Sequence, residues 1–187
     1  FENKLRILKP LVRKKYYEEL TNIEEERLFT ITIIGGSQGA KIFDNLVHQS
    51  LAKVSKSINI KVIHQTSKSN KNFLLNFYKE NRIEHQVFVF EKDLNKLLIK
   101  SDLCITRGGA SSLAELSLLK VPFISIPLPS AMDNHQYENA KFYEAQNACW
   151  IINQKDFEKQ NFEDLLLNII KNKEEYLVKK KNLENLN

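Results

Sequence analysis

The chain has 187 residues, of which 42% are hydrophobic and 27% charged, and its formal net charge is +5 at pH 7. This length allows one domain with its own core and excludes a second of similar size, while no apolar run approaches the roughly 20 residues that span a bilayer. The positive charge is compatible with a nucleotide, an anionic membrane surface or a nucleic acid as partner, and does not choose among them.

Predicted strands and helices alternate along the chain. Residues 1–28 form a charged lead-in or linking segment that Pro10 interrupts. Strand-like apolar runs follow at 29–34, 58–63, 87–90, 102–105, 122–126 and 148–152. Helical stretches are predicted at 40–54, 69–80, 93–100, 111–120, 134–146 and 161–172. The alternation is typical of βαβ units and predicts an α/β fold with a doubly wound, Rossmann-like parallel sheet over residues 29–172, followed by a helical tail at 173–187.

Two glycine-rich turns stand out. The first strand ends in Gly35-Gly36-Ser37-Gln38-Gly39-Ala40, and the strand at 102–105 leads into Arg107-Gly108-Gly109-Ala110-Ser111-Ser112. Each turn joins a strand to a helix and should open at the carboxyl edge of the sheet, where α/β proteins bind ligands. Backbone N–H groups and the helix dipole at a helix start favour a phosphate, and glycine allows its close approach. Two such turns predict a ligand with a diphosphate.

The glycine spacing argues against a dinucleotide cofactor. Gly35, Gly36 and Gly39 give G-G-x-x-G rather than G-x-G-x-x-G, and the next strand ends at His64-Gln65 without the acidic residue that holds an adenosine ribose. The G-K-[ST] sequence of an ATP-binding loop is also missing. We therefore expect no nicotinamide, flavin or other cofactor, and a nucleotide that is held in another manner.

A carboxylate follows the second turn. Glu115 lies one helical turn beyond Ser111 on the same face, where it can accept hydrogen bonds from two ribose hydroxyls. Ser111 and Ser112 add hydroxyl donors, and residues 103–114 contain no acid that would repel a phosphate. The alternative is that one of the serines caps the helix and that Glu115 stabilises its first turn.

A third polar cluster follows the strand at 122–126. A proline-rich loop leads into Asp133-Asn134-His135-Gln136 at the start of a helix. Because the loop leaves the same sheet edge, Asn134, His135 and Gln136 could bind sugar hydroxyls or phosphates, whereas Asp133 could be a helix N-cap.

The histidines differ in their expected roles, and His135 is the best functional candidate. His48 and His85 are expected on helix or loop surfaces as bystanders, while His64 is either structural or lines the cleft. No Asp-x-Asp pair occurs, and no His, Cys, Asp and Glu spacing is typical of a metal site, so we expect no metal. Helix dipoles and hydrogen-bond donors would then stabilise a leaving diphosphate.

Together these segments resemble the MurG family of bacterial glycosyltransferases, which add N-acetylglucosamine to lipid I in peptidoglycan synthesis. The resemblance is strong over residues 28–150 and is carried by both glycine turns, His64-Gln65, Glu115, and Asp133-Asn134-His135-Gln136 with Asn139-Ala140. It implies a hexosyltransferase with a GT-B fold of two domains. This chain looks like the carboxyl-terminal half, which binds UDP-N-acetylglucosamine, and residues 1–28 would belong to the interdomain segment.

The resemblance also implies which residues contact the donor diphosphate. Ser37 and Gln38 would lie in the loop that faces the diphosphate and the sugar. Ala110, Ser111 and Ser112 would form the phosphate-binding helix start.

The remaining implied contacts concern the nucleoside and the sugar. Glu115 would hold the ribose, and His135 with Gln136 would bind the N-acetylglucosamine hydroxyls. The segment that begins at Phe90 matches the place where relatives recognise uracil. Arg13 would match an arginine near the domain junction, although the glycine-asparagine-proline that usually precedes it is replaced in this chain.

The implied reaction needs parts that this sequence does not show. The acceptor hydroxyl would attack the anomeric carbon and invert its configuration, and the resemblance places the general base in a missing amino-terminal domain. That domain would also bind lipid I and associate peripherally with the cytoplasmic face of the bacterial inner membrane. We expect a cytoplasmic protein whose present fragment binds donor and turns over little.

Other functions stay open at this point. One is a non-catalytic UDP-sugar-binding subunit of a two-chain glycosyltransferase, and another is a UDP-sugar epimerase of the same architecture. A nucleic-acid-binding module is the weakest alternative, because the basic residues are dispersed and not interleaved with aromatic residues.

Overall fold

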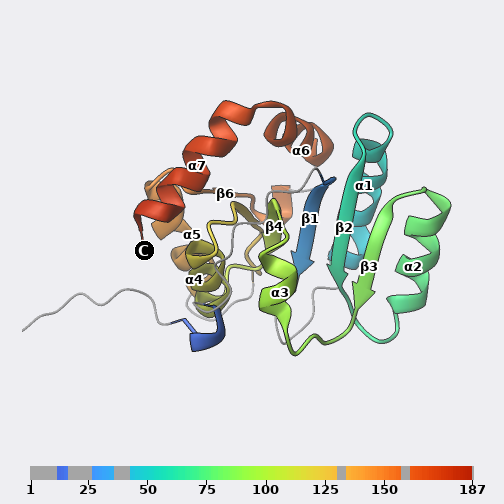
Figure 1. Ribbon diagram of the computed structural model, residues 1–187, viewed down its shortest axis with the longest axis horizontal. Helices are drawn as coiled ribbons and strands as arrows, with labels where there is room; N and C mark the ends of the chain where they lie inside the picture. The colour runs from blue at the N-terminus through green and yellow to red at the C-terminus, as the bar shows by residue number, and fades with distance from the viewer. Residues whose placement is uncertain (1–11, 17–26, 36–42, 130–133, 157–160, 187) are drawn as a thin grey trace, which may run out of the picture.

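A computed structural model describes residues 12–16, 27–35, 43–129, 134–156 and 161–186, and Figure 1 shows a parallel sheet with helices on both faces. The strands are β1 (Phe29–Ile34), β2 (Ile60–Gln65), β3 (Glu84–Phe88), β4 (Leu103–Thr106), β5 (Phe123–Ser125) and β6 (Cys149–Ile151). The α-helices are α1 (His48–Ser55), α2 (Lys71–Glu80), α3 (Leu94–Leu98), α4 (Ala110–Leu118), α5 (His135–Ala145), α6 (Phe162–Lys171) and α7 (Lys173–Asn185). Short helical turns are η2 (Lys14–Tyr16), η3 (Phe43–Val47) and η5 (Gln154–Asp156).

The strand order is β3-β2-β1-β4-β5-β6, and all described neighbours pair in parallel. This is the order of a doubly wound Rossmann-like sheet. The strands β2 and β3 are added on one side of β1 and the last three strands on its other side, so the strand order reverses between β1 and β4. Both central strands are covered on both faces, so Thr30 to Ile34 and all of β4 are buried. The predicted fold class is confirmed.

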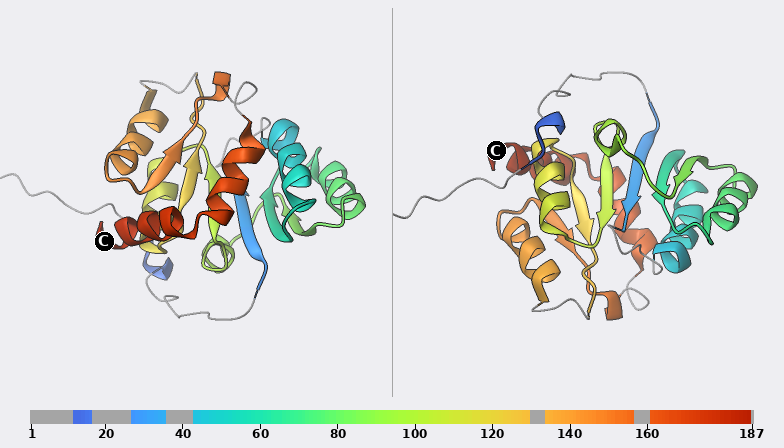
Figure 2. Two further views of the ribbon diagram at one scale, coloured as in Figure 1. Left: turned by 90° about the horizontal axis from the view of Figure 1, so that it is seen from above. Right: turned by 90° about the horizontal axis from the view of Figure 1, so that it is seen from below.

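The core divides between the two faces of the sheet. Leu51 of α1, Leu74 of α2 and Leu166 of α6 belong to one buried cluster. Leu116 of α4 and Leu183 of α7 belong to the other, which also includes residues of α3 and α5. The views from above and below in Figure 2 show the two groups of helices on either side of the strands. Each fully buried leucine stabilises the fold by about 1.5–3 kcal/mol.

Two strand predictions were displaced, each for a local reason. The predicted run 58–63 is observed as Ile60–Gln65, because the Ile58 N–H donates to the Val54 carbonyl at 3.1 Å and so belongs to the turn that ends α1. The run 87–90 is observed as Glu84–Phe88. As an edge strand, β3 exposes Glu84 and Gln86 to solvent, which hid its beginning in the apolar pattern.

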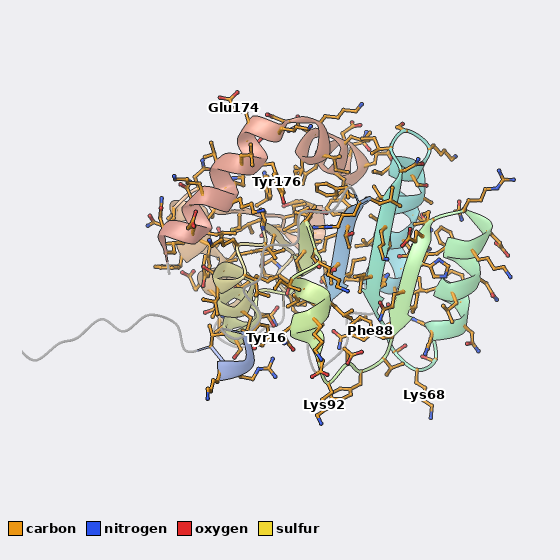
Figure 3. All side chains as sticks on the ribbon, viewed as in Figure 1. Tyr16, Lys68, Phe88, Lys92, Glu174 and Tyr176 are labelled. Atoms are coloured by element: carbon orange, nitrogen blue, oxygen red, sulfur yellow. The ribbon has the colours of Figure 1, made fainter. Side chains whose placement is uncertain are left out.

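The strands β1, β2 and β3 point toward the lower edge of Figure 1, which is the carboxyl edge of the sheet. The turn η2 lies at this edge beside α4 in Figures 1 and 2. Figure 3 shows Tyr16, Lys68 and Lys92 at the same edge, and Glu174 and Tyr176 at the opposite end of the molecule. Within the described part of the chain, no helix has the length and hydropathy to cross a membrane.

Candidate functional site

The two glycine-rich turns leave the sheet side by side. Ile34, the last residue of β1, pairs in register with Thr106, the last residue of β4. Gly35 and Arg107 follow directly, so both turns open at the point where the strand order reverses. Ligands of open α/β sheets bind in the crevice outside this point. The structure therefore places the second turn, and the first residue of the first turn, where the sequence predicted them.

Only the beginning of the first turn is described. The Gly35 N–H donates to Oε1 of Gln65 at 3.1 Å, which ties the turn to the carboxyl end of β2. Ser37 and Gln38, the residues expected to face the diphosphate and sugar, lie outside the described residues.

The second turn leads into a helix start that carries no side-chain cap. Gly109 is the N-cap residue of α4, and among the described residues no side chain forms a capping hydrogen bond there. Ala110, Ser111 and Ser112 occupy the first three helical positions, and the first turn contains no acidic side chain. The alternative that one of the serines caps this helix is therefore wrong. The first N–H groups of α4 remain available to an anion.

Gly108 allows a close approach between this turn and α5. Its φ is +87°, and a Cβ there would lie 2.7 Å from the carbonyl oxygen of Gln136 and 2.7 Å from Oγ of Ser125. Nδ2 of Asn139 donates to the Gly108 carbonyl at 3.1 Å. The start of α5 is thus fastened to the turn that precedes α4.

The third predicted cluster lies at the start of α5. His135 is exposed and Gln136 half-buried, and Oε1 of Gln136 accepts a hydrogen bond from the Leu128 N–H at 2.8 Å. Asp133 lies outside the described residues, and the N-cap position belongs to Asn134, which adopts a left-handed conformation with φ 54°. Gln136 therefore already holds the proline-rich loop through its carbonyl oxygen.

Glu115 makes a contact that the sequence did not predict. It is 4% exposed, and its Oε1 accepts from Nε of Arg13 at 2.8 Å and lies 2.6 Å from Nη2 of the same guanidinium. Arg13 Nη2 also donates to the hydroxyl of Tyr16 at 3.0 Å, and Tyr16 is fully buried. Burial, and then the hydrogen bond to Glu115, raise the pKa of Tyr16. The expected ribose acceptor therefore lies in an ion pair with another predicted site residue.

Arg107 is a site residue whose role the sequence did not reveal. Its Nη1 donates to the Ile126 carbonyl at 3.1 Å and to Oε1 of Gln154 at 2.8 Å, and its Cζ lies 5.0 Å from the ring centroid of Phe43. Burial lowers its pKa. Among the described residues no carboxylate forms an ion pair with it, so its positive charge is available to an anion at the carboxyl edge. The sequence did contain a signal for this role, because Arg107 is a basic residue directly between a buried strand and two glycines.

Phe90 and a pocket lie toward opposite ends of the strand order, the first after β3 and the second beyond β5 and β6. Phe90 follows β3, and 81% of its surface is exposed, which leaves an aromatic ring available for stacking. A pocket of about 270 Å³ lies beyond β5 and β6 and is lined by Pro127, Leu128, Pro129, Asn134, Tyr137, Asn153, Gln154 and Lys155. Gln154 connects this pocket to Arg107.

In the described part of the chain, no three His, Cys, Asp or Glu side chains are grouped to hold a metal ion.

The expected locations of two histidines were wrong, because neither His48 nor His85 lies on a helix or loop surface. His48 is only 4% exposed, and its ring packs edge-on against that of Phe77 with centroids 4.5 Å apart. His85 is half-buried on β3, where Nδ1 lies 2.8 Å from the Ile83 carbonyl oxygen. His64 is fully buried in β2, where its neighbours are Tyr78 and Asp44, so it fits the structural role rather than the cleft-lining one.

Comparison with known families agrees with this arrangement. The model of the glycosyltransferase family 28 C-terminal domain matches residues 30–186. The chain belongs to glycosyltransferase family 28. The resemblance seen in the sequence is confirmed, and so is the Rossmann-like fold of one half of a GT-B glycosyltransferase.

Curated relatives match most or all of this chain. A protein of Pelagibacter ubique (strain HTCC1062), named UDP-N-acetylglucosamine--N-acetylmuramyl-(pentapeptide) pyrophosphoryl-undecaprenol N-acetylglucosamine transferase, is 43% identical over 100% of the chain and 52% of that relative. A protein of the same name from Rickettsia massiliae (strain Mtu5) is 35% identical over 84% of the chain and 43% of the relative. The chain thus spans about half the length of the relatives it matches.

Solved structures show the same fold. MurG of Acinetobacter baumannii superposes with a TM-score of 0.74 at 24% identity, covering 95% of this chain and 48% of that one. A glycosyltransferase of Streptomyces sp. SF2575, solved with thymidine diphosphate, superposes with a TM-score of 0.60 at 13% identity over 87% of this chain and 38% of that one.

Proposed function

We propose that this chain is the donor-binding half of an inverting glycosyltransferase that transfers N-acetylglucosamine from UDP-N-acetylglucosamine to lipid I and forms lipid II. The names of the family 28 relatives support this donor and product. The observation that carries the proposal is the uncapped start of α4 beside the end of β1, at the reversal point of the sheet. An anionic diphosphate would bind at such a helix start, where backbone N–H groups and the helix dipole favour negative charge.

The diphosphate would lie against α4. Backbone N–H groups at Ala110, Ser111 and Ser112 would bind it, with the serine hydroxyls as further donors. Ser37 and Gln38 would approach the diphosphate from the first turn. The buried Arg107, at the end of β4, would add positive charge. As the bond between the anomeric carbon and UDP breaks, negative charge grows on UDP. Loss of one preorganised donor to such a charge typically costs about 10²–10³ in rate.

The ribose would bind at Glu115. Its hydroxyls would donate to the carboxylate in place of Arg13, whose side chain is 62% exposed and can turn toward solvent or the diphosphate. If ribose hydroxyls replace the guanidinium as donors, the buried carboxylate keeps its hydrogen bonds. Loss of Arg13 without a new donor would leave that carboxylate unpaired, which costs free energy. Phe90 would lie near the uracil, as an exposed aromatic ring at the same sheet edge.

The N-acetylglucosamine ring would contact the start of α5. His135 is exposed there, and the amide nitrogen of Gln136 can donate while its oxygen holds the Leu128 N–H. Because Gly108 and Asn139 join α5 to the second turn, the sugar contacts and the phosphate contacts would share one framework.

The general base and the acceptor site would lie outside this chain. The relatives are about twice as long as the matched region, and the additional half would bind lipid I and the cytoplasmic face of the inner membrane. By this proposal the present chain binds donor and needs that half for turnover.

Thermal unfolding with parallel ligands tests the proposal. UDP-N-acetylglucosamine and UDP should raise the melting temperature, because a ligand at 100 times its dissociation constant stabilises by about 2.7 kcal/mol. NAD and ATP at the same concentrations are the matched controls and should have little effect. Equal stabilisation by ATP, or none by the uridine compounds, would overturn the proposal.

A further inference from the structure

A tyrosine hydroxyl lies beside the carboxylate that is proposed to bind the ribose. Tyr16 is the last residue of η2, and its N–H donates to the Arg13 carbonyl at 3.0 Å, which closes one tight helical turn. Side chains three residues apart in such a turn lie on the same side of it. Nη2 of Arg13 donates to the Tyr16 hydroxyl at 3.0 Å and lies 2.6 Å from Oε1 of Glu115. Both side chains of the turn therefore meet at one carboxylate.

The hydroxyl proton of Tyr16 is donated to Glu115. The oxygen of this hydroxyl already accepts from Arg13, and a guanidinium has no acceptor, so the proton must go to another group. Burial, followed by the hydrogen bond to Glu115, raises the pKa of Tyr16, as expected for a phenol that donates to a carboxylate. Glu115 thus has two donors, the guanidinium of Arg13 and the phenol of Tyr16.

The two donors differ in their freedom to leave the carboxylate. The side chain of Arg13 is 62% exposed, whereas Tyr16 is fully buried in the apolar cluster that contains Ile34 of β1 and Leu116 of α4. A guanidinium at the surface can turn into solvent, but a buried ring cannot do so without losing its packing. Ribose hydroxyls can therefore replace Arg13 while Tyr16 keeps its hydrogen bond to Glu115.

A donor that stays in place restricts the orientation of the carboxylate. The last side-chain torsion of a glutamate is broad, so an unrestrained carboxylate presents its oxygens in many directions. The hydrogen bond from Tyr16 selects among these directions and leaves the remaining lone pairs of Glu115 for the ligand. A sugar with one hydroxyl fewer then leaves an acceptor unpaired, because the restrained carboxylate cannot turn to compensate.

We infer that Tyr16 is a positioning residue that orients Glu115 toward both ribose hydroxyls and so determines a preference for UDP over 2′-deoxy-UDP. The inference rests on the proposed function and adds a residue that does not itself touch the ligand. The fold alone does not impose this preference, because the similar glycosyltransferase of Streptomyces sp. SF2575 was solved with thymidine diphosphate, whose sugar lacks the 2′-hydroxyl.

Calorimetry with UDP and with 2′-deoxy-UDP measures the preference. The wild-type chain should bind UDP about tenfold or more tightly than 2′-deoxy-UDP. Tyr16→Phe keeps the buried ring and removes only the hydroxyl. This variant should weaken UDP binding by about five- to tenfold and change 2′-deoxy-UDP binding by less than about twofold, which removes most of the preference.

Tyr176→Phe is the matched control, because it removes a phenol hydroxyl at the opposite end of the molecule (Figure 3). That hydroxyl donates to the Asp102 carbonyl at 2.9 Å. The affinities of this variant for both diphosphates should equal those of the wild type.

A double substitution tests whether Tyr16 acts through the carboxylate. In a Glu115→Ala background, Tyr16→Phe should change UDP affinity by less than about twofold, because the residue that the hydroxyl orients is gone. A further loss as large as that in the wild-type background would show that Tyr16 acts by another route, and would overturn the inference.

Arg13→Ala separates the two donors. Because Tyr16 still donates to Glu115 in this variant, the preference for UDP over 2′-deoxy-UDP should be retained. Loss of the preference would assign it to Arg13 instead and would contradict the role of Tyr16.

The outcomes distinguish the inference from the proposed function. If the wild-type chain binds neither diphosphate, the proposed function fails and the inference fails with it. If the wild type binds both equally well, or if Tyr16→Phe weakens both by the same factor, donor binding stands and the inference alone is wrong. Circular dichroism identifies a variant that does not fold, and if Tyr16→Phe is one, the result for Arg13→Ala decides.

Discussion

Arg13 and Glu115 are 102 positions apart in sequence, yet Nη2 of the arginine lies 2.6 Å from Oε1 of the glutamate. The pair joins the amino-terminal segment to α4 at the carboxyl edge of the sheet. It also occupies the carboxylate for which the proposed function requires a ribose. The exchange of the arginine for the ribose at Glu115 can be tested by substituting either Arg13 or Glu115.

Arg13→Ala should cost about 1–3 kcal/mol of stability, because it removes a donor from a buried carboxylate. Uridine affinity should not decrease, since the ribose no longer displaces a guanidinium. Denaturant unfolding and calorimetry measure the two effects. A clear loss of uridine affinity would show instead that Arg13 contacts the nucleoside directly.

Glu115→Gln should weaken uridine and UDP binding by similar factors of about tenfold, because an amide offers one acceptor oxygen where the carboxylate offers two. The fold should persist, since the amide oxygen can still accept from Arg13. Competition against UDP-N-acetylglucosamine is a suitable measurement. Ser111→Ala serves as the comparison, for which UDP affinity should fall and uridine affinity should not.

Gly108→Ala should destabilise the fold by about 1–3 kcal/mol or more, because φ is +87° and the new Cβ would lie 2.7 Å from the Gln136 carbonyl oxygen. Gly109→Ala is the matched control. Its φ is −64°, and the nearest atom to its Cβ, Oγ of Ser112, is 4.0 Å away. That variant should lose less than about 1 kcal/mol. Similar melting temperatures for the two variants would contradict the close approach between the turn and α5.

Stability should fall as the pH is lowered from about 7 toward 5. Burial lowers the pKa of His64 and of His48, so the unfolded chain takes up protons near pH 6.5 that the folded chain does not. Unfolding then becomes more favourable by up to about 1.4 kcal/mol per pH unit for each such histidine. Urea unfolding at several pH values measures the slope, and His64→Gln should reduce it. An unchanged slope in that variant would remove His64 as a source of the effect.

Local signals accounted for most of the fold. The alternation of apolar runs with helical spacing predicted β1 with its observed bounds and the parallel doubly wound sheet. The turns at Gly35 and Gly108 were correctly placed at one sheet edge, because each glycine sequence follows a buried strand directly. The edge strand β3 was the least visible, since Glu84 and Gln86 face solvent and interrupt its apolar pattern.

The site residues were only partly predictable for a different reason. Glu115 was proposed as a ribose acceptor from its spacing on a helix, and that role stays a prediction. Its contacts with Arg13 and Tyr16 were not predictable, because those residues come from a segment whose position depends on the completed fold. The burial of Asp44 was also not predicted, because a charged residue in an amphipathic stretch is ordinarily solvated, and its burial against His64 and Asn70 depends on the completed fold. Contacts between distant segments leave no periodic trace in the sequence.

The absence of a side chain at Gly108 limits how this protein can be re-engineered. Because the backbone of Gln136 fits against that glycine, a shift of the first residues of α5, where the proposed function places the sugar contacts, would also have to move the turn before α4. Exchanging the 127–136 region alone for that of another transferase should therefore give misfolded or inactive hybrids more often than new sugar preferences. Chimaeras that carry 107–140 across as one block keep the interlocking surfaces matched.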